Sequence, residues 1–283
     1  MFEKRAYLLE VTVRRPNRET LRRLVDMLAR LKYNELFLYS EMGGNDSSLV
    51  ESVSSVEVMI RTMDPEGLQK VREEGVCEVM TGAECSLAGR LETMRERMAA
   101  AEQKHRGVKR LMVTDFSDGC DWHSPVVSLP GLVMGAYFGL VGAKAAKMDL
   151  ELELSRFLDA PLAALLLRLG TLYLRGGAYH PEASEYFNIL SGDCGYSRHQ
   201  GITDSVLEEV SSILRVIIGT AERYLPRSET AKEIIYTALL MDAACHRRSA
   251  MRLKSVKEEF IKMWNRHFIS ARRDEVADRL PRF

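Results

Sequence analysis

The residues best suited to chemistry follow an apolar run near position 110. Residues 110–114, Arg-Leu-Met-Val-Thr, predict a buried strand, and Asp115, Asp118 and Trp122 come directly after it. Carboxylates accept hydrogen bonds from hydroxyl groups and an indole offers a flat apolar face, which is the combination that a pyranose ring requires. The alternative is an ordinary strand-to-loop junction in which the aspartates serve a turn. The combination favours a ligand site.

The same segment resembles the last barrel strand of bacterial family 20 glycoside hydrolases, the relatives of β-N-acetylhexosaminidase. In that family a Thr-Asp-Trp-Gly-Asp run precedes a Trp and a Ser-x-Pro-Gly turn. The matching positions are Thr114, Asp115, Asp118 and Trp122, with the turn at residues 128–131. The positions that depart from the pattern are Phe116, Ser117 and Asp121, the last of which replaces a His.

Other segments resemble the same family, in the same order. Residues 5–11 are similar to its first barrel strand, residues 28–41 to its first helix and second strand, and residues 82–90 to its seventh strand and the following helix. Strands three to five of the family have no counterpart. The resemblance therefore implies an abridged (β/α) TIM-like barrel.

The resemblance also implies substrate-binding roles. Arg5 matches an arginine that holds sugar hydroxyls through its forked donors, although a surface arginine is the alternative. Glu10 and Glu41 close the first two predicted strands, so they either face the barrel mouth or pair with Arg5 or Arg14 as structural support.

The catalytic residues are unknown from the sequence. Glycosidases normally use two carboxylates, and in family 20 an Asp that orients the substrate acetamide stands beside a Glu that is the acid. That pair belongs to the segment without a counterpart, and the neighbours at 73–74 and 274–275 do not end strands. At two places where the family has a Trp that lines the sugar pocket, this chain has residues 61–62 and 84–85, which contain no aromatic side chain. We expect weakened glycan binding and negligible turnover.

The elements that must position these residues alternate between strand and helix in the first half. Strands are predicted at 6–13, 35–40, 55–60, 76–82 and 108–115, with a closing strand at 131–140. Helices are predicted after 20, from Pro65 and across 88–104. About six strands fall short of a complete barrel, and the short linker 42–54 predicts that the strand at 55–60 lies beside the strand at 35–40.

The pattern becomes wholly helical after Asp149. One stripe runs from Val206 to Ala221, and Thr230 with Glu233 predicts a capping box for the next helix. We therefore expect an α/β protein of two domains: the abridged barrel at 1–146 and an all-helical domain at 147–283.

The amino-acid composition limits the classes of partner and cofactor that we expect. The 40 basic and 40 acidic residues balance, and the five cysteines are odd in number and scattered. We expect no nucleic-acid or membrane partner, no cofactor, no metal site, and a cytoplasmic location. The basic run at 14–23 is more typical of a solvated face than of a nucleic-acid patch, and His123 beside Asp121 is more typical of polar surface than of a metal cluster.

Three functional hypotheses remain. The first is a family 20-like protein that acts on or binds terminal N-acetylhexosamine glycans. The second is a noncatalytic glycan-binding or assembly module derived from the hydrolase fold. The third is an internally deleted hydrolase whose exposed barrel edges recruit a second copy of the chain or aggregate.

Overall fold

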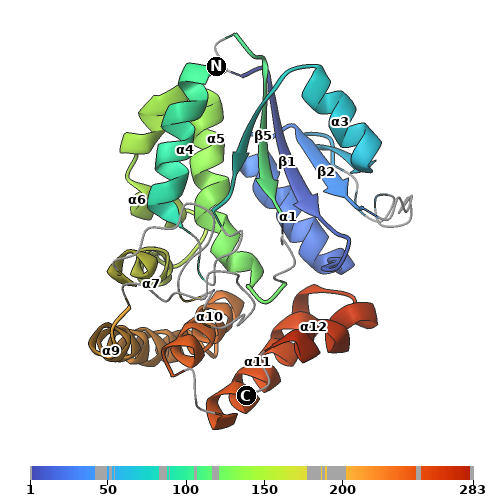
Figure 1. The fold of residues 1–283 in the computed structure, drawn as a ribbon. Helices are drawn as coiled ribbons and strands as arrows, with labels where there is room; N and C mark the ends of the chain where they lie inside the picture. Colours follow the sequence, from blue (N-terminus) through green and yellow to red (C-terminus); the bar gives the residue numbers. More distant parts are fainter. Residues whose placement is uncertain are drawn as a thin grey trace.

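A parallel sheet forms the centre of the computed structural model, which describes residues 2–41, 50, 53, 55–82, 88, 90–104, 107–116, 121–176, 186, 189, 202–246 and 250–280. The strands are β1 (Lys4–Glu10), β2 (Glu35–Tyr39), β3 (Met59–Met63), β4 (Val76–Met80) and β5 (Arg110–Asp115). The five-stranded sheet has the order β3-β2-β1-β5-β4 (Figure 1).

The first and last strands are neighbours, because β1 pairs in parallel with both β2 and β5. This order is what an eight-stranded barrel would retain if three consecutive strands were removed. The predicted pairing of β2 with the third strand is confirmed, with Leu36 opposite Ile60. Among the described strands, β3 and β4 lie at open edges, so an intact barrel is not formed and the α/β class alone is established.

Both faces of the sheet are covered by helices. The helices α1 (Arg18–Arg30), α4 (Leu91–Lys104) and α5 (Leu129–Val141) contribute to one core with Tyr7, Leu36 and Val113. The helix α3 (Pro65–Glu73) lies on the other face, where Leu68 packs with Phe37 and Met112. Since side chains alternate along a strand, Tyr7, Leu9 and Asp115 belong to the first face, whereas Glu10 belongs to the second.

The predicted closing strand at 131–140 is wrong, because this segment lies within α5. The helix is buried on nearly all sides, so its sequence lacks the polar face that would have revealed a helical period. A Cβ added at Gly131 would lie 2.1 Å from the Thr81 carbonyl oxygen, which shows how closely the helix approaches the end of β4. The stretch Pro125–Lys147 is long and apolar enough to cross a membrane, yet most of it is buried in the fold, as in a core helix.

The described part of the second half is helical, as predicted. Its α-helices are α6 (Leu150–Leu154), α7 (Ala160–Leu169), α9 (Asp204–Ala221), α10 (Glu229–Cys245), α11 (Ala250–His267) and α12 (Arg273–Arg279). Short 3₁₀ segments are η1 (Pro125–Ser128), η2 (Gly142–Lys147), η3 (Leu172–Gly176), η4 (Glu222–Tyr224) and η5 (Ser270–Arg272). The cap of α10 differs from the prediction, because Ser228 rather than Thr230 accepts a hydrogen bond, from the Ala231 amide.

The C-terminal helices lie beyond the carboxyl ends of the strands (Figure 1). Phe268 forms a β-bridge with Pro16, and the Ile269 amide donates to the Arg15 carbonyl oxygen at 2.9 Å. The Asn17 side-chain amide donates to the Arg266 carbonyl oxygen at 2.6 Å. The chain following α11 therefore covers the loop after β1, where barrel enzymes usually keep an open site.

Candidate functional site

Arg5 lies at the amino end of β1, far from the polar carboxyl end. Its Nε donates to the Lys32 carbonyl oxygen at 2.6 Å, and its guanidinium also donates to the Phe2 carbonyl oxygen at 3.0 Å. Arg5 is opposite Leu111, whereas Leu9 is opposite Asp115. At about 3.3 Å per residue these positions are roughly 13 Å apart. The expectation that Arg5 reaches the space beside Asp115 does not hold.

Glu10 and Glu41 lie at the carboxyl edge of the sheet, as predicted. Glu10 is opposite Tyr39 and is partly exposed, while Glu41 is exposed and its amide donates to Thr12 Oγ1 at 3.0 Å. The alternation along β1 places Glu10 on the face covered by α3. Glu10 and Asp115 thus share an edge of the sheet but belong to opposite faces.

Asp115 is bonded to a residue that the sequence did not single out. The Tyr7 hydroxyl donates to Asp115 Oδ2 at 2.7 Å, and both side chains are buried. Burial, followed by the negative charge of Asp115, raises the pKa of Tyr7 well above its usual value. The Tyr7 hydroxyl therefore keeps its proton at neutral pH and remains a hydrogen-bond donor to this carboxylate.

Arg14 contacts two residues of the segment that follows β5, His123 and Asp121. Its guanidinium lies 2.7 Å from His123 Nε2, and because a guanidinium only donates, Nε2 must accept and the imidazole must be neutral. Arg14 Nε also forms an ion pair with Asp121 Oδ1 at 3.4 Å. Arg14 is only 4% exposed, so its predicted place on a solvated face is wrong.

One oxygen of Asp115 remains without a hydrogen bond. His123 Nε2 is 4.0 Å from Asp115 Oδ1, which is too far for a hydrogen bond, and this nitrogen already accepts from Arg14. Asp115 is buried, with only 4% of its surface exposed, and yet Oδ1 has no hydrogen-bond partner among the described residues. Buried polar atoms in native proteins are nearly always satisfied, by protein, water or ligand.

A cavity of about 430 Å³ opens beside this carboxylate. Asp115, Tyr7, Arg14 and Ser128 contribute its polar lining, and Ser128 Oγ is a second buried atom without a described hydrogen-bond partner. The apolar lining comes from α1, α5 and the segment after α6: Leu24, Met27, Leu129, Leu132, Phe157 and Leu158. The volume is within the usual range for small-ligand sites.

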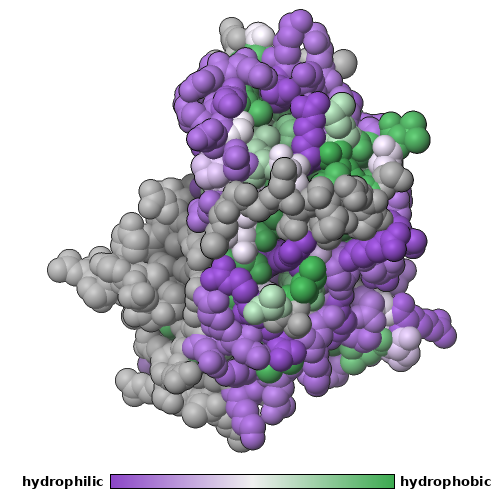
Figure 2. All heavy atoms as spheres, turned by 90° about the vertical axis from the view of Figure 1, so that its right-hand side faces the viewer, coloured by the Kyte–Doolittle hydropathy of each residue, from purple (hydrophilic) through white to green (hydrophobic). Residues whose placement is uncertain are grey.

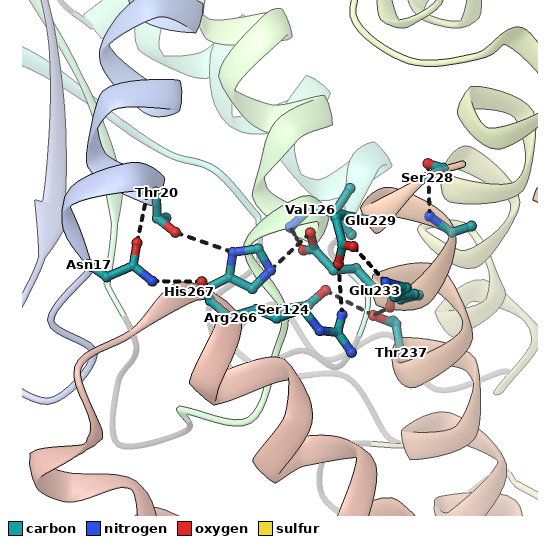
Figure 3. Close-up of polar contacts among 12 residues, drawn as sticks. Asn17, Thr20, Ser124, Val126, Ser228, Glu229, Glu233, Thr237, Arg266 and His267 are labelled. Carbon is teal, nitrogen blue, oxygen red and sulfur yellow. Dashed lines mark hydrogen bonds and ion pairs between the residues drawn. The ribbon is translucent and has the colours of Figure 1, made fainter. Parts of the chain in front are cut away.

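Polar contacts close one end of the cavity (Figure 3). Glu233 of α10 accepts from the Val126 amide at 2.9 Å, and its other oxygen lies 3.2 Å from His267 Nε2. His267 Nδ1 is 3.4 Å from Thr20 Oγ1 on α1. Glu229 accepts a hydrogen bond from Lys232, and this contact is the main reason that the pKa of Glu229 is lowered. Helices from both halves of the chain therefore build this end.

Trp122 cannot act as an exposed stacking platform. Its side chain is 5% exposed and packs in the core of the C-terminal helices, while its carbonyl oxygen accepts from the Tyr236 hydroxyl. Asp118 lies outside the described residues. Of the five candidate binding residues that the structure describes, Asp115 is the one that lines the cavity. Within the described residues, no group of three His, Cys, Asp or Glu side chains could hold a metal ion.

Sequence reasoning missed Tyr7, Arg14, Ser128 and Glu233 as cavity residues. Tyr7 resembled another apolar strand residue, and the carboxylate it bonds is 108 residues away. Ser128 offered the clearest signal, because it belongs to the Ser-x-Pro-Gly turn, but there it was counted only as a turn residue.

Comparison with known proteins adds no family to these observations. No family model matches the chain. A search of curated proteins also finds no match.

Proposed function

We propose that this protein binds a terminal N-acetylhexosamine in the cavity beside Asp115 and does not hydrolyse it. The observation that carries the proposal is the buried carboxylate oxygen Asp115 Oδ1, which has no hydrogen-bond partner among the described residues and belongs to a side chain that lines the cavity. A sugar hydroxyl would donate to this oxygen and form a charge-assisted hydrogen bond.

The remaining lining is consistent with a sugar. Ser128 Oγ can exchange a hydrogen bond with a second hydroxyl group, and Arg14 offers donors from the same end. Phe268 adds aromatic surface for the apolar face of a pyranose ring. The resemblance of residues 110–131 to the last strand of family 20 glycoside hydrolases supports the choice of N-acetylhexosamine.

Three of the four carboxylates that line the cavity, Asp115, Glu229 and Glu233, are poorly suited to act as a general acid in glycosidic cleavage, and the fourth, Asp26, is exposed on α1. A general acid must hold a proton near neutral pH. The pKa of Glu229 is lowered, chiefly by its hydrogen bond with Lys232, so that this group is ionised. Both Glu233 oxygens contact other protein groups, the Val126 amide and His267. Asp115 already accepts from Tyr7. The proposal is therefore one of binding rather than turnover.

The test is a titration of N-acetylglucosamine into the full chain, followed by calorimetry or ligand-observed NMR. Asp115→Asn should weaken binding by about 10- to 100-fold, because it removes a charged acceptor worth about 1.5–3 kcal/mol. The variant can still accept from Tyr7, so the fold should persist. Asp278→Asn, at an exposed ion pair with Lys257, is the matched control and should bind as the original protein does.

Absence of sugar binding by the unchanged protein would refute the proposal, as would equal binding by Asp115→Asn. An assay with an aryl N-acetylhexosaminide tests the second half of the claim. Turnover near that of ordinary enzymes, roughly 1 to 10³ per second, would show that the chain holds a catalytic pair.

A second candidate function is an assembly module. Among the described strands, β3 and β4 each pair on one side only, and Val56 and Met59 near β3 are exposed. The side of the molecule that carries α3 is mainly hydrophilic, with hydrophobic residues gathered in its upper middle (Figure 2). Light scattering of the purified chain tests this alternative, which requires a dimer or larger assembly.

A further inference from the structure

The cavity beside Asp115 is elongated and follows α1. Its lining includes Thr20, Leu24, Met27 and Arg30, which form one stripe along that helix. At 1.5 Å per residue, the stripe spans about 15 Å. This length exceeds a single pyranose ring, so a bound N-acetylhexosamine would leave part of the cavity unfilled.

The end near Thr20 is polar. Thr20 Oγ1 lies 3.4 Å from His267 Nδ1, and Glu233 lies beyond His267 (Figure 3). Asp115 ends β5 at the same carboxyl edge of the sheet, from which α1 begins. Several groups able to bind hydroxyls therefore lie at this end.

The end near Arg30 combines apolar side chains with the charged side chains of Asp26 and Arg30. The Arg30 guanidinium lies 4.4 Å from the centre of the Phe157 ring and donates to the Arg156 carbonyl oxygen at 2.8 Å. Arg30 thus stacks on an aromatic ring at this end, and Leu132 and Met27 line the space between Phe157 and the polar end. The apolar part of this surface offers dispersion contacts.

We infer that the cavity takes an amphipathic glycoside, an N-acetylhexosamine whose apolar alkyl or aryl aglycone lies along α1 towards Phe157. The inference rests on the proposed function, since it assigns the sugar to Asp115, and it adds the chemical class of the group attached to the sugar. The aglycone removes apolar surface from water against Leu24, Met27, Leu132 and Phe157.

The test compares three probes on the full chain by calorimetry, below the concentration at which any of them aggregates: N-acetylglucosamine, octyl β-N-acetylglucosaminide and 1-octanol. Each methylene group that becomes buried should strengthen binding by roughly fourfold. The octyl glycoside should therefore bind at least about tenfold more tightly than the free sugar.

A substitution locates the aglycone. Met27→Gln keeps the length of the side chain but introduces an amide, so it should remove most of the gain from the octyl chain and leave the affinity for the free sugar nearly unchanged. Arg22→Gln, on the exposed side of α1, is the matched control and should preserve the gain.

The outcomes separate the two claims. If the sugar and the octyl glycoside bind equally, the inference is overturned and the proposed function stands. If the gain persists in Met27→Gln, the aglycone lies elsewhere and the inference is also overturned. If octanol binds as tightly as the octyl glycoside while the sugar does not bind, or if none of the three binds, both claims fail.

Discussion

Tyr7 and Asp115 are 108 residues apart in the chain, yet the Tyr7 hydroxyl donates a 2.7 Å hydrogen bond to Asp115 Oδ2 on the face of the sheet that α1, α4 and α5 cover. The parallel register of β1 and β5 brings them together, with Tyr7 opposite Val113 and Leu9 opposite Asp115. This contact fixes one oxygen of the carboxylate, while the other oxygen has no hydrogen-bond partner among the described residues.

Tyr7→Phe should lower the free energy of unfolding by about 1–3 kcal/mol, because Asp115 would lose the one hydrogen bond described for its carboxylate. Urea unfolding followed by circular dichroism measures the change. Tyr39→Phe is the matched control in the neighbouring strand, since its hydroxyl has no hydrogen bond among the described residues, and it should change stability by less. Equal effects of the two substitutions would contradict the assigned bond.

Gly131→Ala should destabilise the fold by about 1–3 kcal/mol or more, because its Cβ would lie 2.1 Å from the Thr81 carbonyl oxygen. Gly219 is also in a helix, but no atom lies within 4 Å of its added Cβ. Gly219→Ala should therefore stabilise the protein by about 0.5–1 kcal/mol through its higher helix propensity. Thermal unfolding of both variants gives the comparison, and a harmless Gly131→Ala would contradict the close packing of α5.

Cys77 and Cys245 should resist alkylation in the folded protein. Burial raises the pKa of the Cys77 thiol to about 11 and that of Cys245 to about 12, so few thiolates are present at pH 8. Iodoacetamide labelling followed by peptide mass spectrometry should show slow modification at both positions, and rapid modification in urea. Rapid labelling of either site without denaturant would show that it is exposed.

Glu233→Gln should lower the free energy of unfolding by about 1–3 kcal/mol, because it weakens the contacts to the Val126 amide and to His267. Glu229→Gln, one helical turn earlier, removes a more exposed ion pair with Lys232 and should cost less than about 1 kcal/mol. Denaturant unfolding of the two variants distinguishes a buried junction from a surface contact. A larger effect at Glu229 would reverse that assignment.

Much of the sheet could be predicted from the sequence. Leu36, Phe37 and Leu38 form a continuous apolar run, and all three are buried in β2, which has helices on both sides. Asp64 before Pro65 is a clear helix start, and its side chain caps α3 at the Gly67 amide. The limits of prediction appear at α5, where burial on all sides removed the helical period.

The candidate site was less predictable because it depends on contacts between distant residues. Asp115 could be identified from its place after a strand, but which face of the sheet it joins depends on the register. Arg14 belongs to a basic run that suggested solvent, and its burial follows from contacts with the distant residues Asp121, His123 and Phe268. The burial of Trp122 likewise follows from helices that the local sequence does not specify.

The most direct test of the central claim is to soak a crystal of the full chain in N-acetylglucosamine and determine its structure. We expect the sugar in the cavity between α1 and α5, with a hydroxyl group within hydrogen-bond distance of Asp115 Oδ1. A sugar bound instead on the other face, beside Glu10 and Glu41, or a cavity that contains only water at saturating sugar, would contradict the account.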